Sequence, residues 1–371
     1  MTMSMVKPPA MPGGASMHTE TDATSTTDTW GGRAQARLRP GRSLHVDAGF
    51  DATQWDAEGT RWIERERMGT TTTMVLRTWP GVRVTDLGAF TQASLAAAPW
   101  LDAGAGGRID RVLRRADGYA RTTEWVPSGN VGVRIGGNRP LFGRAALGFG
   151  YRVPDPTELY GLLLRPDGFI YVGEPNLATE QSRSVEFSLG WKSERLRATA
   201  TVYRNEISEY ISTAVRGDSI SGIPVRQYRN VADARIEGVS GALDVRATPW
   251  LEWRGTLSSI RGESRGSGAS LPAIAPLEGT LAARAVPGGE WPWIEPELLL
   301  AARQDDPALS AGEVETAGFA VVHLRGGRSF GRTTAIAGVE NVFDKQYRRH
   351  LDPQSIARPG RNLFAKLTRR F

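Results

Sequence analysis

The sequence of 371 residues contains no cysteine and no long apolar run. The absence of cysteine excludes disulfide frameworks, thiolate zinc sites and cysteine nucleophiles. No window approaches the roughly 20 consecutive apolar residues of a membrane-spanning helix, so any crossing of a membrane must use strands. The 43 glycines, 22 prolines and mean hydropathy of −0.33 suit strands and turns better than buried helices.

Lysine is also scarce, so the net charge of +6 rests almost wholly on arginine. The arginines are scattered and form no basic cluster, which argues against nucleic acid and leaves anionic lipid headgroups or an anionic cargo open. Residues 1–32 lack the apolar core of a signal peptide and read as a polar, Thr-rich loop. Either the protein is not exported, or its true start lies upstream of Met1.

Runs of about 10 residues with alternating polarity recur along the chain and end at turn residues, as in barrel strands. In one run every second residue is apolar, namely Val185, Phe187, Leu189 and Trp191. The next run, after a turn at 193–194, repeats this with Leu196, Ala198, Ala200 and Val202. A period of two places the apolar set on one face of a sheet. That face must meet an apolar medium while the other meets water.

The lengths of the connections distinguish a barrel from a soluble sandwich. We predict about 15 strands, near 31–38, 44–51, 83–96, 100–111, 127–137, 141–152, 182–192, 195–206, 235–246, 250–261, 277–286, 293–304, 316–325, 331–343 and 360–371. Every second connection is a tight turn and the others are long, which is the layout of an outer-membrane barrel. The strand-like segment 67–78 is placed inside a long connection from 52 to 82.

Tryptophan follows the tight turns in Pro99-Trp100, Pro249-Trp250 and Trp291-Pro292-Trp293. This position fits an aromatic girdle at a membrane interface, the alternative being packing in a sandwich core. An odd number of strands does not close a bacterial single-chain barrel, and an open edge in lipid leaves backbone groups without partners. We therefore expect the chain to be incomplete at its N-terminus.

Four segments resemble TonB-dependent receptors when taken together in their order and spacing. They are Tyr151-Arg152-Val153-Pro154 with Glu158-Leu159-Tyr160; 173–180; Asn230-Val231 to Ile236-Glu237-Gly238-Val239; and 341–347 with 358–362 and the terminal Phe371. The resemblance covers 150–371 well and 30–150 by strand pattern alone. Departures from the family's pattern are Glu174, Thr179, Ser240 and Arg369.

This resemblance implies an all-β fold, an antiparallel transmembrane β-barrel in the cell outer membrane with about 15 strands of a probable 22 and without the N-terminal plug. Residues 31–371 would be the C-terminal portion of the barrel and residues 1–30 a Met- and Thr-rich extracellular loop remnant. The implied function is active import of a metal or metal chelate. The implied partners are the TonB complex through the missing plug, the barrel assembly machinery through Phe371, and outer-membrane lipid. The alternative is a passive porin-type channel or a non-functional truncated barrel.

Enzymatic constellations are lacking, so we expect neither catalysis nor a bound cofactor. The four histidines, His18, His45, His323 and His350, are far apart and show no metal-ligand spacing. No Gly-rich phosphate loop and no nucleophile elbow occurs. His323 lies in a predicted strand, where a position facing the barrel interior is the simpler interpretation.

Methionine is concentrated in the first segment. Five of the seven methionines are there, and a histidine adjoins the last: Met1, Met3, Met5, Met11, Met17 and His18. Thioether sulfur selects Cu(I), and the family includes copper receptors, so these six residues are candidate metal ligands. Alternatively, Met1 is an initiator and the others belong to a disordered tail or form adaptable apolar contacts. Siderophore and cobalamin import also stay open.

Tyrosine and arginine in the long connections are candidate contacts for a cargo. An anionic or aromatic chelate would be bound by charge and stacking. The residues that we single out for this role are Tyr160, Tyr171, Arg226 and Tyr228.

Overall fold

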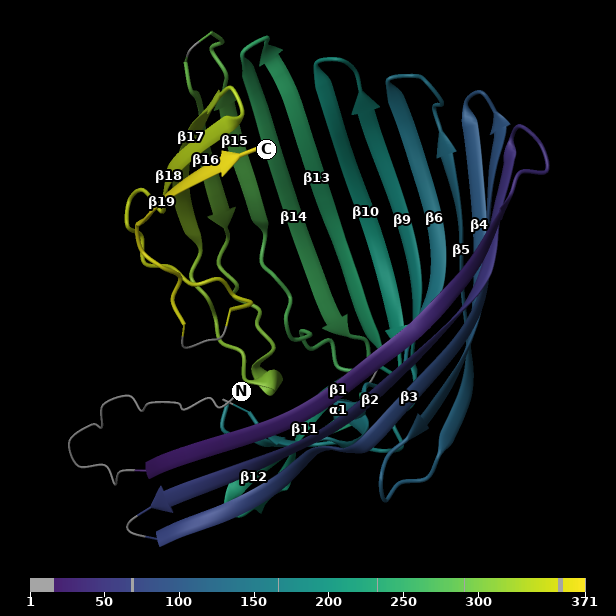
Figure 1. Cartoon of the computed structure of the whole chain (residues 1–371), viewed down its shortest axis with the longest axis vertical. Helices are drawn as coiled ribbons and strands as arrows, with labels where there is room; N and C mark the ends of the chain where they lie inside the picture. Colours follow the sequence, from purple (N-terminus) through teal and green to yellow (C-terminus); the bar gives the residue numbers. More distant parts are fainter. Residues whose placement is uncertain are drawn as a thin grey trace.

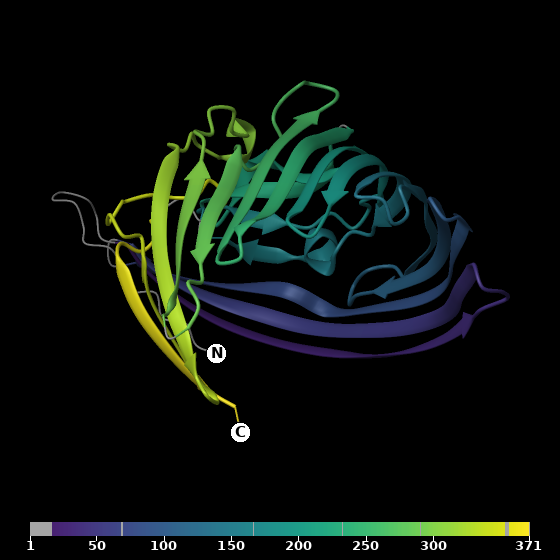
Figure 2. The ribbon, with the colours of Figure 1, turned by 90° about the horizontal axis from the view of Figure 1, so that it is seen from above.

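A 15-stranded antiparallel sheet, curved around an interior, forms most of the molecule (Figures 1 and 2). The structure is a computed structural model that describes residues 17–67, 70–165, 167–231, 233–289, 291–352 and 356–370. In spatial order the strands are β1 (Met17–Leu38), β2 (Leu44–Arg67), β3 (Thr70–Ala98), β4 (Leu101–Arg115), β5 (Thr122–Ile135), β6 (Leu141–Arg152), β9 (Glu180–Lys192), β10 (Leu196–Ser208), β13 (Ala234–Thr248), β14 (Leu251–Ser264), β15 (Glu278–Ala285), β16 (Trp293–Ala301), β17 (Phe319–Phe330), β18 (Thr333–Glu340) and β19 (Asn362–Arg369). Each corresponds to one predicted strand, which confirms the all-β class and the antiparallel barrel wall.

The register of neighbouring strands places the apolar residues of the alternating runs side by side. Phe187 of β9 stands opposite Val202 of β10, and Leu189 opposite Ala200. These side chains point outward, with Phe187 56% and Leu189 59% exposed. A continuous band of exposed apolar side chains across neighbouring strands requires an apolar medium around it.

The first three strands are longer than predicted, and Figure 1 shows them extending beyond the other strands of the wall. β2 and β3 pair from Leu44 opposite Leu95 to Arg67 opposite Thr70, so the predicted long connection at 52–82 is wrong. β1 begins at Met17 and pairs with β2 over its whole length, so residues 17–30 are strand and not loop. The many threonines of this segment favour extended backbone. Because the segment is polar on both faces, its sequence does not show the alternation of apolar and polar residues that predicts a strand.

A smaller sheet, here called the loop sheet, lies inside the concave wall and was not predicted. It consists of β11 (Ile211–Ile220), β12 (Ile223–Asn230), β8 (Ile170–Val172) and β7 (Leu162–Leu164) in this order. Strands β7 and β8 come from the connection between β6 and β9, while β11 and β12 come from that between β10 and β13. The parallel pairing of β12 with β8 joins the two connections into one unit. A short helix, α1 (Pro156–Tyr160), precedes β7, and a 3₁₀ turn, η1 (Leu309–Ala311), lies further along the chain.

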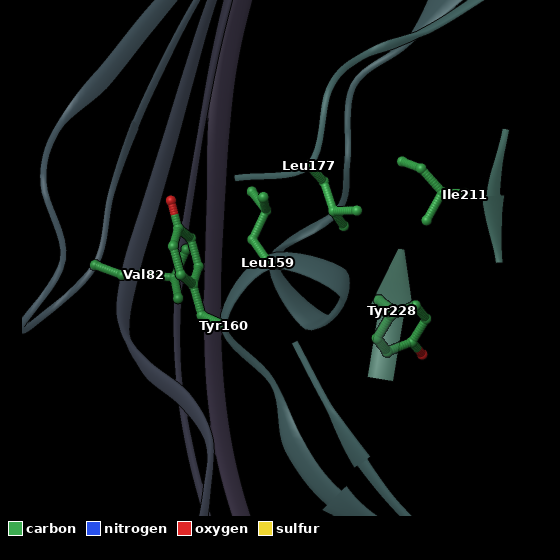
Figure 3. Packing of buried hydrophobic residues seen from close by; sticks show 7 residues of the cluster. Val82, Leu159, Tyr160, Leu177, Ile211 and Tyr228 are labelled. Atoms are coloured by element: carbon green, nitrogen blue, oxygen red, sulfur yellow. The ribbon is translucent and has the colours of Figure 1, made fainter. Parts of the chain in front are cut away.

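Two buried apolar clusters fasten α1 and the loop sheet to the inner face of β3. One contains Val82, Ala116, Leu159, Tyr160, Leu177, Ile211 and Tyr228, and Figure 3 shows Val82 of β3 beside Tyr160 of α1. The other contains Ile170, Ile223 and Val225, with Met74 of β3 packed against them. Hydrogen bonds reinforce this contact, since Trp79 Nε1 donates to Thr157 Oγ1 at 3.1 Å.

The main sheet is open in the described part of the chain. Its end strands, β1 and β19, each pair with one neighbour, β2 and β18 respectively. The prediction that the sheet does not close is confirmed for these residues. The described segments contain no helix with the length and apolarity needed to cross a membrane.

Candidate functional site

Arg152, at the end of β6, joins several elements around the interior mouth of the wall. Its Nη1 donates to Glu158 of α1 at 2.8 Å, while Nε and Nη2 donate to the two carboxylate oxygens of Glu180 at 2.7 Å each. Glu180, at the start of β9, also accepts a hydrogen bond from Ile211 N of β11 at 2.7 Å. This arrangement, here called the arginine latch, connects β6, α1, β9 and β11. It explains why the Tyr-Arg-x-Pro and Glu-Leu segments occur together.

Helix α1 holds one arm of the arginine latch because its N-terminus is capped. The Asp155 carboxylate accepts from Thr157 N at 2.6 Å and from Glu158 N at 3.0 Å, and Glu158 accepts from Asp155 N at 2.8 Å. This reciprocal capping box satisfies backbone donors that have no partner inside the helix, and Pro156 fits the first turn. A helix of five residues is not stable alone, so packing and capping together fix its place.

Asn230 fastens the two connections of the loop sheet to each other. Its Nδ2 donates to Ala178 O at 3.1 Å and to Glu209 O at 2.6 Å, and its Oδ1 accepts from Ala178 N at 2.8 Å. The amide side chain therefore replaces a backbone pairing between residues that are 52 positions apart. The Asn-Val segment has a structural role at this point.

Asn341 does the same at the last long connection, near β18 and β19. Its Oδ1 accepts from Lys345 N at 2.8 Å and its Nδ2 donates to Lys345 O at 2.8 Å and to Pro359 O at 3.3 Å. Asp344 accepts from Arg361 N at 2.7 Å. The two parts of the C-terminal family-like segment, 341–347 and 358–362, are thus held together by hydrogen bonds.

Three of the four predicted cargo contacts lie close together in the loop sheet. Tyr171 of β8 is the register partner of Arg226 of β12, and the rings of Tyr171 and Tyr228 are 6.0 Å apart. Arg165 lies over the Tyr171 ring at 4.4 Å and donates to Tyr228 Oη at 2.8 Å. The fourth, Tyr160, packs on Tyr119 with ring centroids 4.8 Å apart, and it shares with Tyr228 the buried apolar cluster against which Tyr171 packs.

These side chains are largely enclosed in this conformation by their own connections, by β3 and by η1. Tyr160 is 5%, Arg226 5% and Tyr228 8% exposed, and Tyr171 is half-buried. Burial, together with the hydrogen bond to Asp167, raises the pKa of Tyr171 to about 12, so its hydroxyl stays protonated at neutral pH. Their contact with a cargo stays a prediction, and no pattern in the sequence indicated that they are buried.

The predicted metal ligands are the first two residues of β1 and four residues that precede it in the sequence. Met1, Met3, Met5 and Met11 lie outside the described residues. The backbones of Met17 and His18 stand opposite Arg67 and Glu66 at the end of the β2–β3 hairpin that is far from the tight turns. Within the described ranges, no group of three or more His, Cys, Asp or Glu side chains is placed to hold a metal ion.

Two other histidines have hydrogen-bonding roles in the last connections. Nδ1 of His323 accepts a hydrogen bond from Asn341 N at 3.2 Å. Nδ1 of His350 lies 3.0 Å from Thr316 Oγ1. Nε2 of His350 lies 3.5 Å from a carboxylate oxygen of Glu313. These contacts stabilise local structure.

Paired charges on the inward face of the wall were not predicted residue by residue. Arg108 of β4 donates to both carboxylate oxygens of Asp51 on β2, at 2.8 and 2.7 Å, and to the fully buried Asp110. Gly88 of β3 lies between them, and a Cβ there would collide with the Arg108 guanidinium. Only glycine leaves room for this pairing. The alternation of polarity places charges inside the wall, but it does not say which of them meet.

A second inward cluster surrounds Glu295 of β16, which is 1% exposed. Arg254 donates to its carboxylate at 2.5 Å and Arg325 at 2.8 Å. Arg325 also reaches Glu297 at 2.8 Å. The interior of the wall is therefore lined by arginine and carboxylate pairs, which suits a water-containing passage.

The comparisons with known proteins agree with this architecture. The family model described as TonB dependent receptor-like, beta-barrel matches residues 7–342. No curated protein sequence matches the chain. Among solved structures, the copper transporter OprC has a TM-score of 0.80 and 23% identity, over 94% of this chain and 57% of that chain.

Two iron receptors share the fold at lower similarity. The ferric yersiniabactin uptake receptor FyuA from Yersinia pestis has a TM-score of 0.67 and 14% identity, over 95% of this chain and 55% of that chain. A point mutant of the ferric enterobactin receptor PfeA from Pseudomonas aeruginosa has a TM-score of 0.61 and 15% identity, over 96% and 62%. At these identities the likeness concerns the fold, and the chain spans 55% to 62% of the length of the structures compared. Because the family model matches nearly the whole chain, the chain belongs to the TonB-dependent receptors, as strands of their β-barrel.

Proposed function

We propose that this chain provides the wall and the capture surface of an outer-membrane receptor that imports a metal or a metal chelate with energy supplied through TonB. The observation that carries the proposal is the family match over 7–342. Proteins of known structure with this fold include a copper transporter and ferric siderophore receptors, which supports the cargo class. Proteins of this family reside in the outer membrane, where the outward apolar band faces lipid.

The loop sheet is the part of the chain that we assign to cargo capture. It covers the interior side of the long β2–β3 hairpin (Figure 1). The arginine latch holds β11 there, because Glu180 pairs with Arg152 and accepts from Ile211 N. Movement of the loop sheet away from β3 would uncover Tyr228, and its separation from η1 and Phe169 would uncover Arg226. The two side chains offer a stacking ring and a cation to an anionic or aromatic chelate. Transport involves no covalent step, so no catalytic residue is needed.

If the cargo is copper, specific residues of this chain are expected to bind it. The start of β1 brings Met17 and His18 to the rim far from the tight turns, and the other four candidate ligands precede them in sequence. Thioether sulfur and imidazole suit Cu(I) better than hard cations. A site at this rim would meet external metal first.

Cu(I) binding to the full chain in detergent, measured by competition with a chromophoric Cu(I) chelator, tests this assignment. Replacing Met3, Met5, Met11 and Met17 by leucine should weaken binding by at least about ten-fold, since the soft ligands are lost at little change in volume. Met74→Leu is the matched control, because Met74 packs in the buried cluster of the loop sheet. Equal Cu(I) affinity in the two variants would contradict copper as the cargo and leave a metal chelate.

The receptor mechanism is tested separately in the host. Deletion of the gene should lower cellular metal or chelate accumulation only where TonB is functional. An equal loss with and without TonB would contradict the receptor and favour the passive channel.

A further inference from the structure

The last three long connections contact one another. They are 265–277 between β14 and β15, 302–318 between β16 and β17, and 341–361 between β18 and β19. Gln304 Nε2 donates to Ile274 O at 2.8 Å, which joins the first two connections. His350 Nδ1 lies 3.0 Å from Thr316 Oγ1, which joins the second and the third. The backbones of Gln304 and Thr316 pair with each other, so the three connections are linked through one short bridge.

Glu313 lies where these connections meet. One carboxylate oxygen accepts from Ala273 N at 2.7 Å, and the other accepts from Ala308 N at 3.0 Å. The second oxygen also lies 3.5 Å from His350 Nε2. Ala308 directly precedes η1, so the carboxylate fixes the start of that turn. Among the described residues, no arginine or lysine forms an ion pair with Glu313, which leaves His350 as its partner of opposite charge.

The imidazole of His350 is enclosed and one of its nitrogens has no hydrogen bond. The side chain is 3% exposed, and Nε2 has no hydrogen-bond partner among the described residues. Thr316 Oγ1 donates to Val314 O at 3.4 Å, so this hydroxyl accepts from the Nδ1–H of His350. In that tautomer a neutral ring presents the Nε2 lone pair to the Glu313 carboxylate. A proton on Nε2 turns this repulsive contact into an ion pair.

Few other charges act on this pair. Tyr210, which precedes β11, lies near Glu313, and burial raises the pKa of its hydroxyl, so it stays neutral. Arg348 also has a partner. The next charged groups of the His350 connection are paired with others, Arg349 with Glu278 at 2.7 Å and Asp352 with Arg358 at 2.6 Å. A change in the charge of His350 therefore acts mainly on Glu313.

This pair is connected to the proposed capture surface through η1. Ser310 O of η1 accepts from Arg226 Nη1 at 3.4 Å. Arg226 is 5% exposed, and η1 is part of what encloses it. Because Glu313 fixes the start of η1, the position of Glu313 helps to decide whether Arg226 stays covered.

We propose that His350 and Glu313 form a proton-controlled clasp that holds the last connections closed over Arg226 in acid and releases them as the pH rises. Histidine changes its charge between about pH 5 and 8. The imidazolium attracts Glu313 and holds 341–361 against 302–318. Loss of the proton leaves a lone pair facing a carboxylate in a site shielded from water, which is unfavourable, so the connections separate and η1 leaves Arg226. The proposal rests on the proposed function only in assigning Arg226 to cargo capture.

Hydrogen exchange of the full chain in detergent, without cargo, tests the clasp at about pH 5.5 and about pH 8. Each exchange rate is divided by the intrinsic rate at the same pH. Peptides within 304–317 and 345–352 should be protected at least about ten-fold more strongly at the lower pH. Because no cargo is present, failure of import does not affect this result.

Three variants assign the pH dependence. H350Q cannot gain the proton and should give equal protection at both pH values. E313Q removes the carboxylate that attracts the imidazolium and should also abolish the difference. H45Q is the matched control, because His45 is exposed near a tight turn, and it should keep the wild-type difference. Circular dichroism of each variant establishes that the strands are formed.

A spin label on η1 gives an independent measurement. Since the chain contains no cysteine, L309C carries a single nitroxide at a position that is 73% exposed. Its electron paramagnetic resonance spectrum should show greater mobility at about pH 8 than at about pH 5.5, and the added H350Q change should remove this difference. Equal mobility and equal protection at both pH values in the otherwise unchanged chain, or a full difference that persists in H350Q, would overturn the clasp.

Discussion

Glu180 shows how a single side chain organises distant parts of this chain. It is 6% exposed and receives hydrogen bonds from Arg152 of β6 and from the backbone of β11. Asn230 does similar work by bonding to backbone groups of both connections of the loop sheet, and Asn341 by bonding to backbone groups of the last long connection. The residues that carry the family resemblance therefore hold the connections in place. Residues that hold the long connections in place can contribute to cargo capture only by allowing or preventing movement of those connections.

Replacing Glu180 by glutamine should loosen α1 and β11 without unfolding the wall. The amide keeps the size of the side chain but removes the charge that Arg152 pairs with, and we expect a loss of about 1–2 kcal/mol because Arg152 is partly exposed to solvent. Hydrogen exchange of backbone amides in 155–161 and 209–215 measures the effect. Glu194→Gln, in an exposed tight turn, should change exchange by less than about 0.5 kcal/mol. Unchanged protection at Ile211 would contradict the role of the arginine latch.

At the scale of elements, the loop sheet depends on the long β2–β3 hairpin. Strands β7 and β8 have three residues each, too few to be stable alone. They gain stability from β12 and from the buried cluster of Ile170, Ile223 and Val225 against Met74 of β3. The hairpin is therefore a support for the loop sheet as well as part of the wall.

Ile170→Ala should separate the stability of the loop sheet from that of the barrel wall. Ile170 is fully buried, so the cavity left by truncation should cost about 2–5 kcal/mol. Limited proteolysis should then cleave within 162–172 and 211–230, while β9 and β10 stay protected. Ile356→Ala, at a 57% exposed position, is the control and should leave the cleavage pattern unchanged. Loss of protection throughout the chain would mean that the wall and the loop sheet unfold together.

At the scale of the whole molecule, the strands of the wall could be predicted because each of them has the same alternation of apolar and polar residues. Each strand such as β9 must show apolar residues outward and polar residues inward, and this period of two is visible in sequence. The loop sheet has no such signal, because β12 is buried at Ile223, Val225, Arg226 and Tyr228, on both faces. The candidate site was therefore predicted by residue type alone. Which residues are enclosed depends on the packing of two connections that are separate in sequence.

The two end strands make the last prediction, because each has one paired side only. In a strand paired on one side, the backbone donors on the other side exchange with water or seek another strand. We expect amides in β1 and β19 of the full chain in detergent to exchange faster than those of β9, which pairs with β6 and β10. Peptides covering 17–38, 362–370 and 180–192 measure this by mass spectrometry. Equal protection would mean that the end strands find partners in solution, and a concentration series would then show whether the partner is a second copy of the chain, since protection by a copy falls on dilution.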